Sequence, residues 1–506
     1  MSLLNSFLSW VIKQRIHQME LFMKYPHDVQ MDWFLKLIST ADKTEFGKLH
    51  DFSSIQSYEQ FRQRVPVSDY ESLKPYIERM MLGEENILWP TETKWFAKSS
   101  GTTSDKSKFI PITDDSLEEC HFKGGKDLLS IYCNNYPETE IFSGKGLTLG
   151  GTHQMNVKSE FAKTSFGDLS AIIMENLPVW VEFIRTPDLN TALMSEWESK
   201  IDRIARITIE EDVTNLVGVP SWMLVLLQYV LKITGKSNIS EVWPNLELFM
   251  HGGVSFIPYR EQFKRLISNP NMNYIETYNA SEGFFGIQDQ RNSDELLLML
   301  DYGIFYEFID MNDESTDNPK VYWLSEVKLG VQYAMLITTN AGLWRYKIGD
   351  TIAFTNIEPY RIRITGRTKH FINTFGEEII IENAEKALAM ACTKTGAIIR
   401  EYTAGPVFMD EKTKGAHEWF IEFEKQPNNQ SEFNENLDRA LQSINSDYEA
   451  KRYKNITLNP PIVRVLEDGS FYKWMKSKGK LGGQNKVPRL CNNRKYLDEI
   501  QEFLQS

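Results

Sequence analysis

The stretch "AKSSGTTSDKSKFIPIT", residues 97–113, places four hydroxyl side chains around Gly101, and two lysines and an apolar run follow. A glycine lets the backbone turn, so that consecutive N–H groups and neighbouring hydroxyls converge on one concave surface. Such a surface can hold phosphate oxygens, whose charge Lys106 and Lys108 would balance. The same residues also fit a polar hairpin between two strands. The stretch is not a Walker-type P-loop, because it lacks the required glycine, four residues and then Gly-Lys-Ser/Thr.

The segments around this stretch alternate between helical and strand patterns. Residues before about 90 are mostly helical in pattern, and residues 114–136 resume that pattern after the stretch. Residues 245–256 and 273–288 have strand patterns that end in glycine-containing loops. This alternation predicts an α/β fold with a mostly parallel sheet, which binds ligands beyond the carboxyl ends of its strands.

The pattern becomes strand-rich after about residue 296, with aromatic and β-branched residues in short runs. Such runs predict antiparallel sheet or a small barrel. An α+β pattern returns after the charged segment 366–370, where we place a domain boundary. We therefore expect a large N-terminal domain, residues 1–366, of mostly parallel sheets flanked by helices, plus a small β-barrel-like part. A smaller α+β C-terminal domain, residues 367–506, follows it.

Composition limits the possible partners and compartments. The 506 residues are 42% hydrophobic, which is enough for a large core and for two or more domains. A net charge of -13 disfavours nucleic acid and anionic membrane surfaces as partners. The sequence has no signal-peptide pattern and no run of about 18 apolar residues, so we expect no membrane span and a cytoplasmic protein. The scattered cysteines are expected to be reduced thiols: Cys120, Cys133, Cys392 and Cys491.

Two further motifs combine an aromatic or glycine residue with a carboxylate. In "ETYNASEGFFG", residues 276–286, Tyr278 could stack on a flat base and Glu282 could bind magnesium through oxygen. In "LWRYKIGDTIAF", residues 343–354, a glycine at a strand end presents Asp350, which could accept hydrogen bonds from a ribose diol. Each motif alone also fits an ordinary polar turn.

Taken together, the three motifs resemble the nucleotide-binding motifs of the Gretchen Hagen (auxin-responsive promoter) family of acyl acid amido synthetases. The matching segments are "SSGTTSDKSKFIP", "YNASEG" and "RYKIGD". That family belongs to the adenylate-forming superfamily, with acyl-CoA synthetases, peptide-synthetase adenylation domains and luciferase. Residues 242–259 look like the superfamily's adenine strand, residues 363–379 like its interdomain hinge, and residues 483–490 like the family's C-terminal lysine segment.

The resemblance implies a role for each matching residue, with ATP and Mg2+ as the cofactors. It implies that the hinge at 366–370 makes the small C-terminal domain mobile, so that Lys486 enters the site during adenylation. Asp105 departs from the plant pattern, which usually has glycine there. The implied assignments are Ser99, Ser100, Gly101, Thr102, Thr103 and Lys106 to the ATP phosphates; Gly252, Gly253 and Val254 to adenine; Tyr278 and Ser281 to the nucleotide; Glu282 to magnesium; and Asp350 and Arg367 to ribose.

The implied reaction has two steps. A substrate carboxylate attacks the α-phosphate of ATP, which is possible only if magnesium and lysine neutralise the developing charge. An amino acid amine then attacks the acyl-adenylate and AMP leaves. Two alternatives remain open from the sequence: an acyl-CoA ligase, which differs only in the acceptor, and a nucleotide-binding protein without catalysis.

The acyl acid is less well specified by the sequence than the nucleotide. Residues 120–185 lie between the phosphate loop and the adenine strand, so their side chains are expected to line the acyl pocket, with an apolar or aromatic acid as substrate. Met174, Trp180 and Phe183 are candidates for that wall, although large side chains on helices usually belong to the core. His153 and His251 could be general bases, or His251 could simply cap a strand end.

Overall fold

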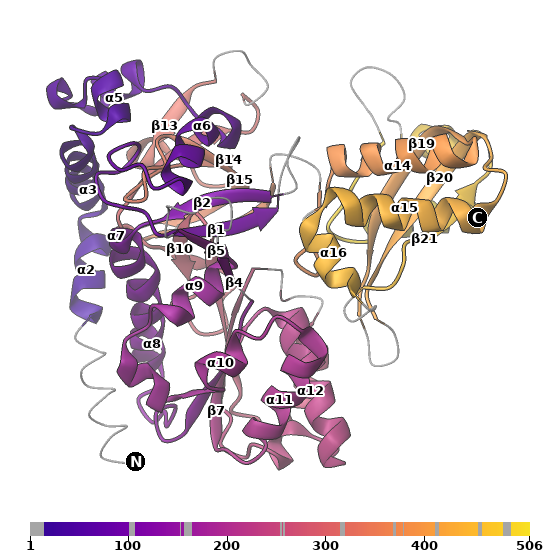
Figure 1. Ribbon diagram of the computed structural model, residues 1–506, viewed down its shortest axis with the longest axis horizontal. Helices are drawn as coiled ribbons and strands as arrows, with labels where there is room; N and C mark the ends of the chain where they lie inside the picture. The colour runs from indigo at the N-terminus through magenta and orange to yellow at the C-terminus, as the bar shows by residue number, and fades with distance from the viewer. Residues whose placement is uncertain are drawn as a thin grey trace. The chain divides into compact units, whose positions relative to one another are not determined.

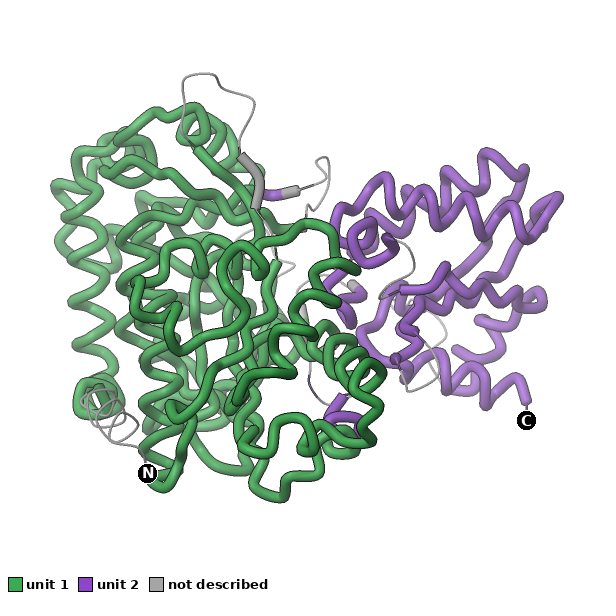
Figure 2. The backbone as a smooth tube through the Cα atoms, turned by 60° about the horizontal axis from the view of Figure 1, so that its bottom comes forward, with its two compact units in different colours: residues 1–99, 109–253, 264–368 green, residues 100–108, 254–263, 369–506 purple. Residues whose placement is uncertain are grey.

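The structure is a computed structural model in which the chain divides into two compact units (Figure 2). Unit 1 contains residues 1–99, 109–253 and 264–368, and unit 2 contains residues 100–108, 254–263 and 369–506. The predicted boundary lay at 366–367; the long segment of unit 2 begins at residue 369, and two short earlier segments also belong to it. The residues described are 15–100, 107–151, 153–155, 164–253, 256, 259–313, 319–367, 371–377, 379–409, 414–453, 458–478 and 487–505.

A twelve-stranded sheet forms the centre of unit 1. Its strand order is β13-β12-β14-β15-β16-β11-β10-β9-β8-β7-β3-β6. The strands from β6 to β9 pair in parallel, and those from β9 to β13 pair antiparallel. The bounds are β3 Lys145–Leu149, β6 Arg185–Thr186, β7 Val213–Gly218, β8 Leu248–Gly252, β9 Asn273–Ala280, β10 Gly283–Ile287, β11 Leu296–Leu298, β12 Ile304–Asp310, β13 Val321–Trp323, β14 Gln332–Thr339, β15 Tyr346–Ile357 and β16 Tyr360–Arg367.

The parallel strands form where short apolar runs alternate with helices. Strand β7 and strand β8 are buried over their first four residues, as expected for strands covered on both faces. The helix between them, α12 (Pro220–Thr234), begins with a proline and is followed by Gly235 at φ +67°. Proline suits the first helical turn and glycine suits the left-handed position after the last, so the sequence sets both ends of this crossover.

A second, four-stranded sheet contains the two strands on either side of the serine- and threonine-rich loop. Its order is β2-β1-β5-β4, with β1 Trp95–Ser100, β2 Ser107–Ile112, β4 His153–Met155 and β5 Ser165–Gly167. The predicted strand, loop and strand are present as β1 and β2, and the loop residues 101–106 lie outside the described residues. Strand β1 pairs in parallel with β5, which places Phe96 opposite Phe166.

Helices cover the sheets of unit 1, as the indigo and magenta ribbons of Figure 1 show. Phe34, on α3, packs against Phe61 of α5 and Phe305 of β12, with ring centroids 5.2 and 5.1 Å away. This contact attaches the N-terminal helices to the antiparallel part of the sheet. The helices are α2 Ile16–Lys24, α3 Pro26–Ala41, α4 Glu45–Leu49, α5 Tyr58–Arg64, α6 Tyr70–Met81, α7 Asp114–Ser116, the π-helical η2 Leu117–Phe122, α8 Lys123–Asn135, α9 Leu169–Glu175, α10 Leu189–Ala192 and α11 Trp197–Thr208. A further helix, α13 Arg260–Leu266, begins in unit 2 and ends in unit 1.

A buried ion pair joins the same helices to the start of β15. The Arg345 guanidinium donates to both oxygens of Glu307 at 2.9–3.1 Å, and the two side chains are only 4% and 1% exposed. Arg345 also donates to the carbonyl of Val65, and the Tyr58 hydroxyl donates to Glu307 at 2.9 Å. Burial and the Glu307 carboxylate raise the pKa of Tyr58, so its phenol stays a donor. The buried charges of Arg345 and Glu307 therefore compensate each other.

Unit 2 is an α+β domain with a three-stranded sheet, in the order β19-β20-β21. The Glu377 carboxylate accepts hydrogen bonds from the amides of Thr374 and Phe375, and His417 lies 2.8 Å from it. These bonds fix the turn that leads into α14. The elements are β17 Phe371–Ile372, β18 Ile379–Ile380, α14 Ile381–Thr395, β19 Ile398–Val407, β20 Ala416–Lys425, α15 Gln430–Ile444, α16 Ser446–Arg452, β21 Ile462–Leu466, α17 Ser470–Ser477 and α18 Lys495–Gln505.

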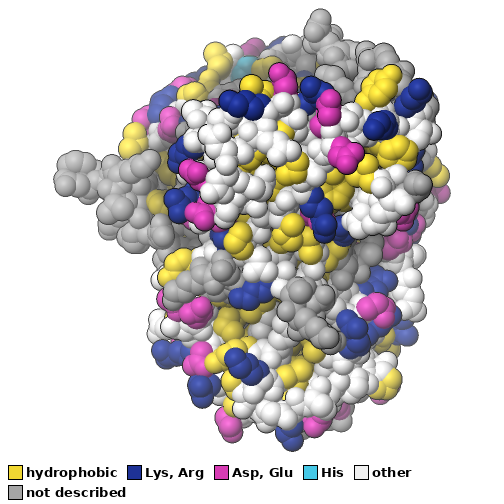
Figure 3. All heavy atoms as spheres, turned by 90° about the vertical axis from the view of Figure 1, so that its right-hand side faces the viewer, with side chains coloured by type: hydrophobic (Ala, Val, Ile, Leu, Met, Phe, Trp, Pro, Cys, Tyr) yellow, Lys and Arg dark blue, Asp and Glu magenta, His cyan; other side chains and the backbone are white. Residues whose placement is uncertain are grey.

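The predicted α/β class is confirmed, although most of the described strand pairs in the main sheet are antiparallel and not parallel as expected. The strand-rich segment after residue 296 takes the form of antiparallel strands that continue the parallel sheet. Among the described residues, no helix combines the length and the hydropathy that crossing a membrane requires. On the face drawn in Figure 3, basic and acidic side chains of both signs are interspersed with hydrophobic ones.

We expect Glu307→Gln to lower the free energy of unfolding by about 3 kcal/mol or more, because it leaves a buried guanidinium without its counter-charge. Urea unfolding followed by tryptophan fluorescence measures the change. Asp294→Asn is the control, since it breaks an exposed pair with Arg363 and should cost less than about 1 kcal/mol. Equal, small losses in the two variants would contradict this account of the ion pair.

Candidate functional site

The first part of the site is the carboxyl end of β8, where two glycines follow the strand. Gly252 pairs with Thr277 of the parallel strand β9, and Gly253 has φ +81°. A Cβ atom at Gly252 would lie 2.7 Å from the Thr277 carbonyl oxygen, a distance that real Cβ atoms do not reach. Glycine is therefore required for this close approach of β8 to β9.

Tyr278, one residue further along β9, connects the two halves of the sheet. Its hydroxyl donates a hydrogen bond of 2.7 Å to Oδ2 of Asp350. Its ring packs against Phe285 with centroids 4.9 Å apart, and the residue is 5% exposed. Tyr278 and Asp350 lie 72 positions apart in the chain. The structure thus brings together the tyrosine of one predicted motif and the aspartate of another.

Asp350 is positioned within β15 by an irregularity of the strand and by the strand beside it. Gly349, inside β15, has φ +92°, which only glycine adopts readily, and the β14–β15 ladder shifts register at this point, between Ala334 and Leu336. Across the β15–β16 ladder Asp350 is the register partner of Arg367. The half-buried Asp350 therefore lies directly across the ladder from Arg367, the other predicted ribose ligand.

Ser281 and Glu282 form the two-residue turn of the hairpin between β9 and β10. The turn is closed by the pair of Ala280 with Gly283. Both turn residues are partly exposed, and Glu282 comes four residues after Tyr278. The hairpin therefore presents the predicted magnesium ligand at the same end of β9 as the nucleotide tyrosine.

The remaining predicted residues are placed less completely. Ser99 and Ser100 end strand β1 in the four-stranded sheet, and Ser99 is half-buried. Strand β1 therefore leads directly into the predicted phosphate loop. The other predicted site residues, together with the hinge residues 368–370, lie outside the described residues: Gly101, Thr102, Thr103, Lys106, Val254 and Lys486.

The candidate pocket residues and histidines separate by burial. Met174 is 3% exposed, whereas Trp180 and Phe183, on the short helix η3 (Val179–Phe183), are 51% and 77% exposed. Exposure excludes the core interpretation for Trp180 and Phe183, and their place in the pocket wall stays a prediction. His251 is 3% exposed with its ring 5.3 Å from that of Phe249, and the side chain of His153 lies outside the described residues.

A buried lysine that the sequence interpretation missed holds the loop after β3. The Nζ of Lys200, on α11, donates to the carbonyl oxygens of Gly150 and Gly151 at 2.7 and 3.1 Å. The residue is 1% exposed, and burial lowers its pKa to about 8. Helical spacing could have found it, since Lys200 lies four residues before the buried Ile204 on the apolar face of α11.

The residues present suit ATP with a magnesium ion. Asp350 offers a carboxylate for a diol, and Gly252 and Gly253 carry no side chain that would stand between a planar base and the end of β8. Among the described residues, no group of three or more His, Cys, Asp or Glu side chains could form a metal site by itself. Mg2+ commonly binds through one or two carboxylates together with substrate phosphates, and Glu282 fits that mode.

Three domain models of one family match the chain in order. The GH3 family N-terminal domain matches residues 15–272, the central domain residues 297–367, and the C-terminal domain residues 382–495.

Two curated relatives from Arabidopsis thaliana match over nearly the whole chain. Indole-3-acetic acid-amido synthetase GH3.4 is 24% identical, with 95% of this chain and 91% of that protein covered. The 4-substituted benzoates-glutamate ligase GH3.12 is 23% identical, with 94% of each covered.

Solved structures with the same fold include both amide-forming and thioester-forming ligases. AtGH3.15 acyl acid amido synthetase in complex with 2,4-DB has a TM-score of 0.60 at 17% identity, covering 94% of this chain and 93% of its own. A 2-hydroxyisobutyryl-CoA ligase in complex with 2-HIB-AMP and CoA has a TM-score of 0.60 at 12% identity, covering 95% of this chain and 92% of its own. At these identities the likeness establishes the fold.

We expect Asp350→Ala to raise the dissociation constant of ATP by about tenfold to a hundredfold, because hydrogen bonds to a charged group are lost. Isothermal titration with ATP measures the effect. Tyr278→Phe, which removes only the hydrogen bond to Asp350, should have a smaller effect. The exposed Asp294 supplies a control in Asp294→Ala, and ATP binding by Asp350→Ala that matches this control would overturn the ribose assignment.

Proposed function

Because the chain belongs to the GH3 family, we propose that it is an ATP-dependent acyl acid amido synthetase, which activates a carboxylic acid as an acyl-adenylate and transfers the acyl group to an amino acid. The curated relatives named as amido synthetases and as a benzoates-glutamate ligase support this proposal. The family models match from residue 15 to residue 495, so the proposal concerns the whole adenylation and transfer cycle.

The observation that carries the proposal is the meeting of Tyr278, Asp350 and the Ser281–Glu282 turn at one end of the sheet. The three lie in two motifs that are far apart in sequence. Ligands of α/β sheets bind beyond the carboxyl ends of the parallel strands, which is where β8 and β9 end.

In the first step we assign the nucleotide contacts as the sequence implied them. Asp350 and Arg367 hold the ribose, the Gly252–Val254 backbone borders the adenine, and Tyr278 and Ser281 contact the nucleotide. Residues 99–103 and Lys106 hold the phosphates that leave as pyrophosphate. Magnesium bound at Glu282 supplies charge neutralisation for the attack of one anion on another.

In the second step an amino acid amine attacks the carbonyl carbon of the acyl-adenylate. The carbon–nitrogen bond forms, the bond to the AMP oxygen breaks, and AMP leaves with its electron pair. The mixed anhydride is already reactive, so the step needs no protein nucleophile. We propose that movement about the hinge at 366–370 brings Lys486 to the site for adenylation and withdraws it for transfer.

The names of the relatives indicate the class of the substrate acid, and the cysteines indicate the cellular compartment. Indole-3-acetic acid and 4-substituted benzoates are named for the relatives, so an aromatic acid is the first substrate class to test. None of the four cysteines, all of which lie within the described residues, forms a disulfide, which suits the reducing environment of the cytoplasm.

Thioester formation is the second candidate, because the fold is shared with a CoA ligase. It shares the adenylation step and differs only in the acceptor. The family match favours the amide, since the GH3 relatives are amido synthetases.

A pyrophosphate-release screen over aryl, indolyl, fatty and small hydroxy acids tests the proposal. We expect release with at least one aromatic acid, an amide in the mass spectrum when amino acids are added, and no thioester when coenzyme A is added. Glu282→Gln should reduce the rate of release by about a hundredfold or more, because the charge on the attacking and leaving oxygens is no longer neutralised.

One control variant and two alternative outcomes make the result decisive. Glu326→Gln changes a carboxylate of η5 (Leu324–Glu326) on the same chain and should leave the rate unchanged. A thioester in place of the amide would assign the second candidate function. ATP binding without pyrophosphate release from any acid would show a binding protein and would rule out both ligase functions.

A further inference from the structure

The hairpin that carries Glu282 lies directly on a helix of the N-terminal half of unit 1. Residues 114–135 form one continuous helical run, α7, η2 and α8, whose middle part is a π-helical turn. π-Helical turns inside α-helices are rare and occur mostly at functional sites. Cys120 and Gly124 lie four residues apart on this run, so they share one face of it.

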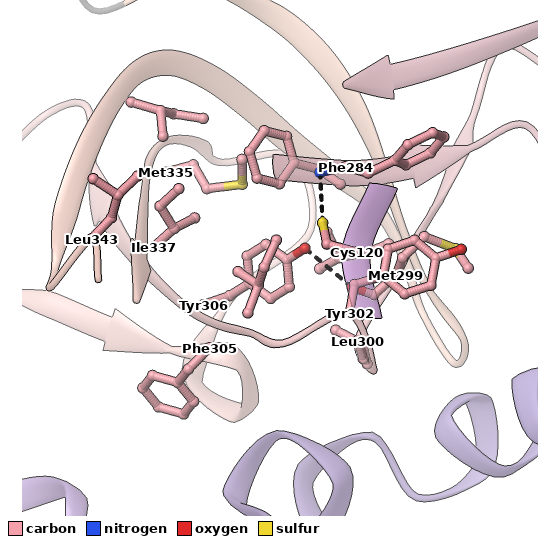
Figure 4. Close-up of a cluster of buried hydrophobic side chains, with 14 of the residues drawn as sticks. Cys120, Phe284, Met299, Leu300, Tyr302, Phe305, Tyr306, Met335, Ile337 and Leu343 are labelled. Atoms are coloured by element: carbon pink, nitrogen blue, oxygen red, sulfur yellow. Dashed lines mark hydrogen bonds between the residues drawn. The ribbon is translucent and has the colours of Figure 1, made fainter. Parts of the chain in front are cut away.

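Cys120 holds the backbone of the hairpin. The amide of Phe284, two residues after Glu282, donates a hydrogen bond of 3.1 Å to the Cys120 sulfur. Figure 4 shows this bond as a dashed line between the helix and the strand that lies across it. Burial raises the pKa of the Cys120 thiol to about 12, so the sulfur is a neutral acceptor.

Gly124 provides the space for the Phe284 ring. A Cβ atom at Gly124 would lie 2.6 Å from Cδ2 and 2.7 Å from Cγ of Phe284. The ring is 7% exposed, and Tyr302 packs against it with centroids 6.0 Å apart and planes at 78°. Tyr302 is itself fully buried and donates to Asp127 on α8, so the ring has little room to move.

The strand also packs closely on its neighbours just after the Glu282 turn. A Cβ atom at Gly283 would lie 2.8 Å from Cδ1 of Ile304 on β12. The ladder between β9 and β10 shifts register between Phe284 and Gly286. The residues after Glu282 are thus held by packing against Ile304 of β12 as well as by backbone pairing with β9.

We propose that the helix face formed by Cys120 and Gly124 is a positioning surface for Glu282, which sets where its carboxylate meets magnesium and the ATP phosphates. The inference rests on the proposed function, because the role of Glu282 does. Neither residue touches substrate in this account. They act through Phe284, whose place fixes the hairpin turn two residues earlier.

Gly124→Ala and Gly125→Ala form a matched pair that tests the surface. The two glycines are adjacent in α8 and gain the same helix propensity from alanine, but a Cβ at Gly125 meets nothing within 4 Å. Optimal carbon contacts lie at about 3.5–4.0 Å, so Gly124→Ala must displace the Phe284 ring by roughly 1 Å. We expect Gly124→Ala to lower the rate of pyrophosphate release by roughly tenfold or more.

The role in positioning predicts which parameter changes. Gly124→Ala should raise the Mg2+ concentration for half-maximal pyrophosphate release severalfold, with the KM of the acyl acid unchanged. Gly125→Ala should leave both at wild-type values. An equal Mg2+ dependence in the two alanine variants would overturn the proposal.

Cys120 gives a second, gentler test in case Gly124→Ala does not fold. Cys120→Ala removes the acceptor and should raise the half-maximal Mg2+ concentration by about threefold to tenfold, the effect of one buried hydrogen bond. Cys120→Ser restores an acceptor and should recover most of the loss. Cys133→Ala, a buried cysteine on the same helical run, is the volume-matched control and should match wild type.

A measurement without turnover separates this inference from the proposed function. Hydrogen exchange of the peptide 283–287 should be faster in Cys120→Ala than in wild type and Cys133→Ala. Calorimetric titration of α,β-methylene-ATP should require more Mg2+ in Gly124→Ala than in Gly125→Ala. Wild-type protein that releases no pyrophosphate would contradict the proposed function, while unchanged exchange and Mg2+ requirement would contradict the positioning surface.

Discussion

The hydrogen bond from Tyr278 to Asp350 joins two halves of a sheet that form in different ways. Strands β8 and β9 belong to the parallel half, which is built from strand and helix alternation, whereas β15 belongs to the antiparallel half. In the sheet order β9 and β15 are separated by β10, β11 and β16, and β11 has only three residues. The hydrogen bond nevertheless brings Tyr278 and Asp350 together, so both strands contribute to one site.

Three glycines are required by a specific contact or backbone angle. Gly252 is set by the carbonyl of Thr277, Gly349 by its positive φ, and Gly124 by the ring of Phe284. Gly252 and Gly124 permit close approach of neighbouring elements, and Gly349 permits a backbone conformation that other residues rarely adopt. The buried pair of Arg345 and Glu307 adds a charged anchor five residues before Asp350. The backbone that carries the carboxylates of the site is thus held by specific packing and by a buried ion pair, as preorganised charge stabilisation requires.

The sequence predicts the parts of this site that depend on local chemistry. Tyr278, Glu282 and Asp350 could be chosen because stacking, metal binding and diol binding each need one residue type beside a glycine turn. Contacts between distant segments have no such local pattern. Nothing around Cys120 or Gly124 indicates Phe284, and Trp180 and Phe183 look like core residues although they are exposed. Lys200 is intermediate, since its helical spacing predicts burial but its partners depend on the loop after β3.

The central claim is that a substrate carboxylate oxygen becomes bonded to the α-phosphorus of ATP. A reaction with an aromatic acid labelled with 18O in both carboxylate oxygens, unlabelled ATP and an amino acid tests it directly by mass spectrometry. The account predicts AMP carrying one 18O atom and an amide carrying the other. ADP together with labelled orthophosphate, or amide formation with unlabelled AMP, would contradict it.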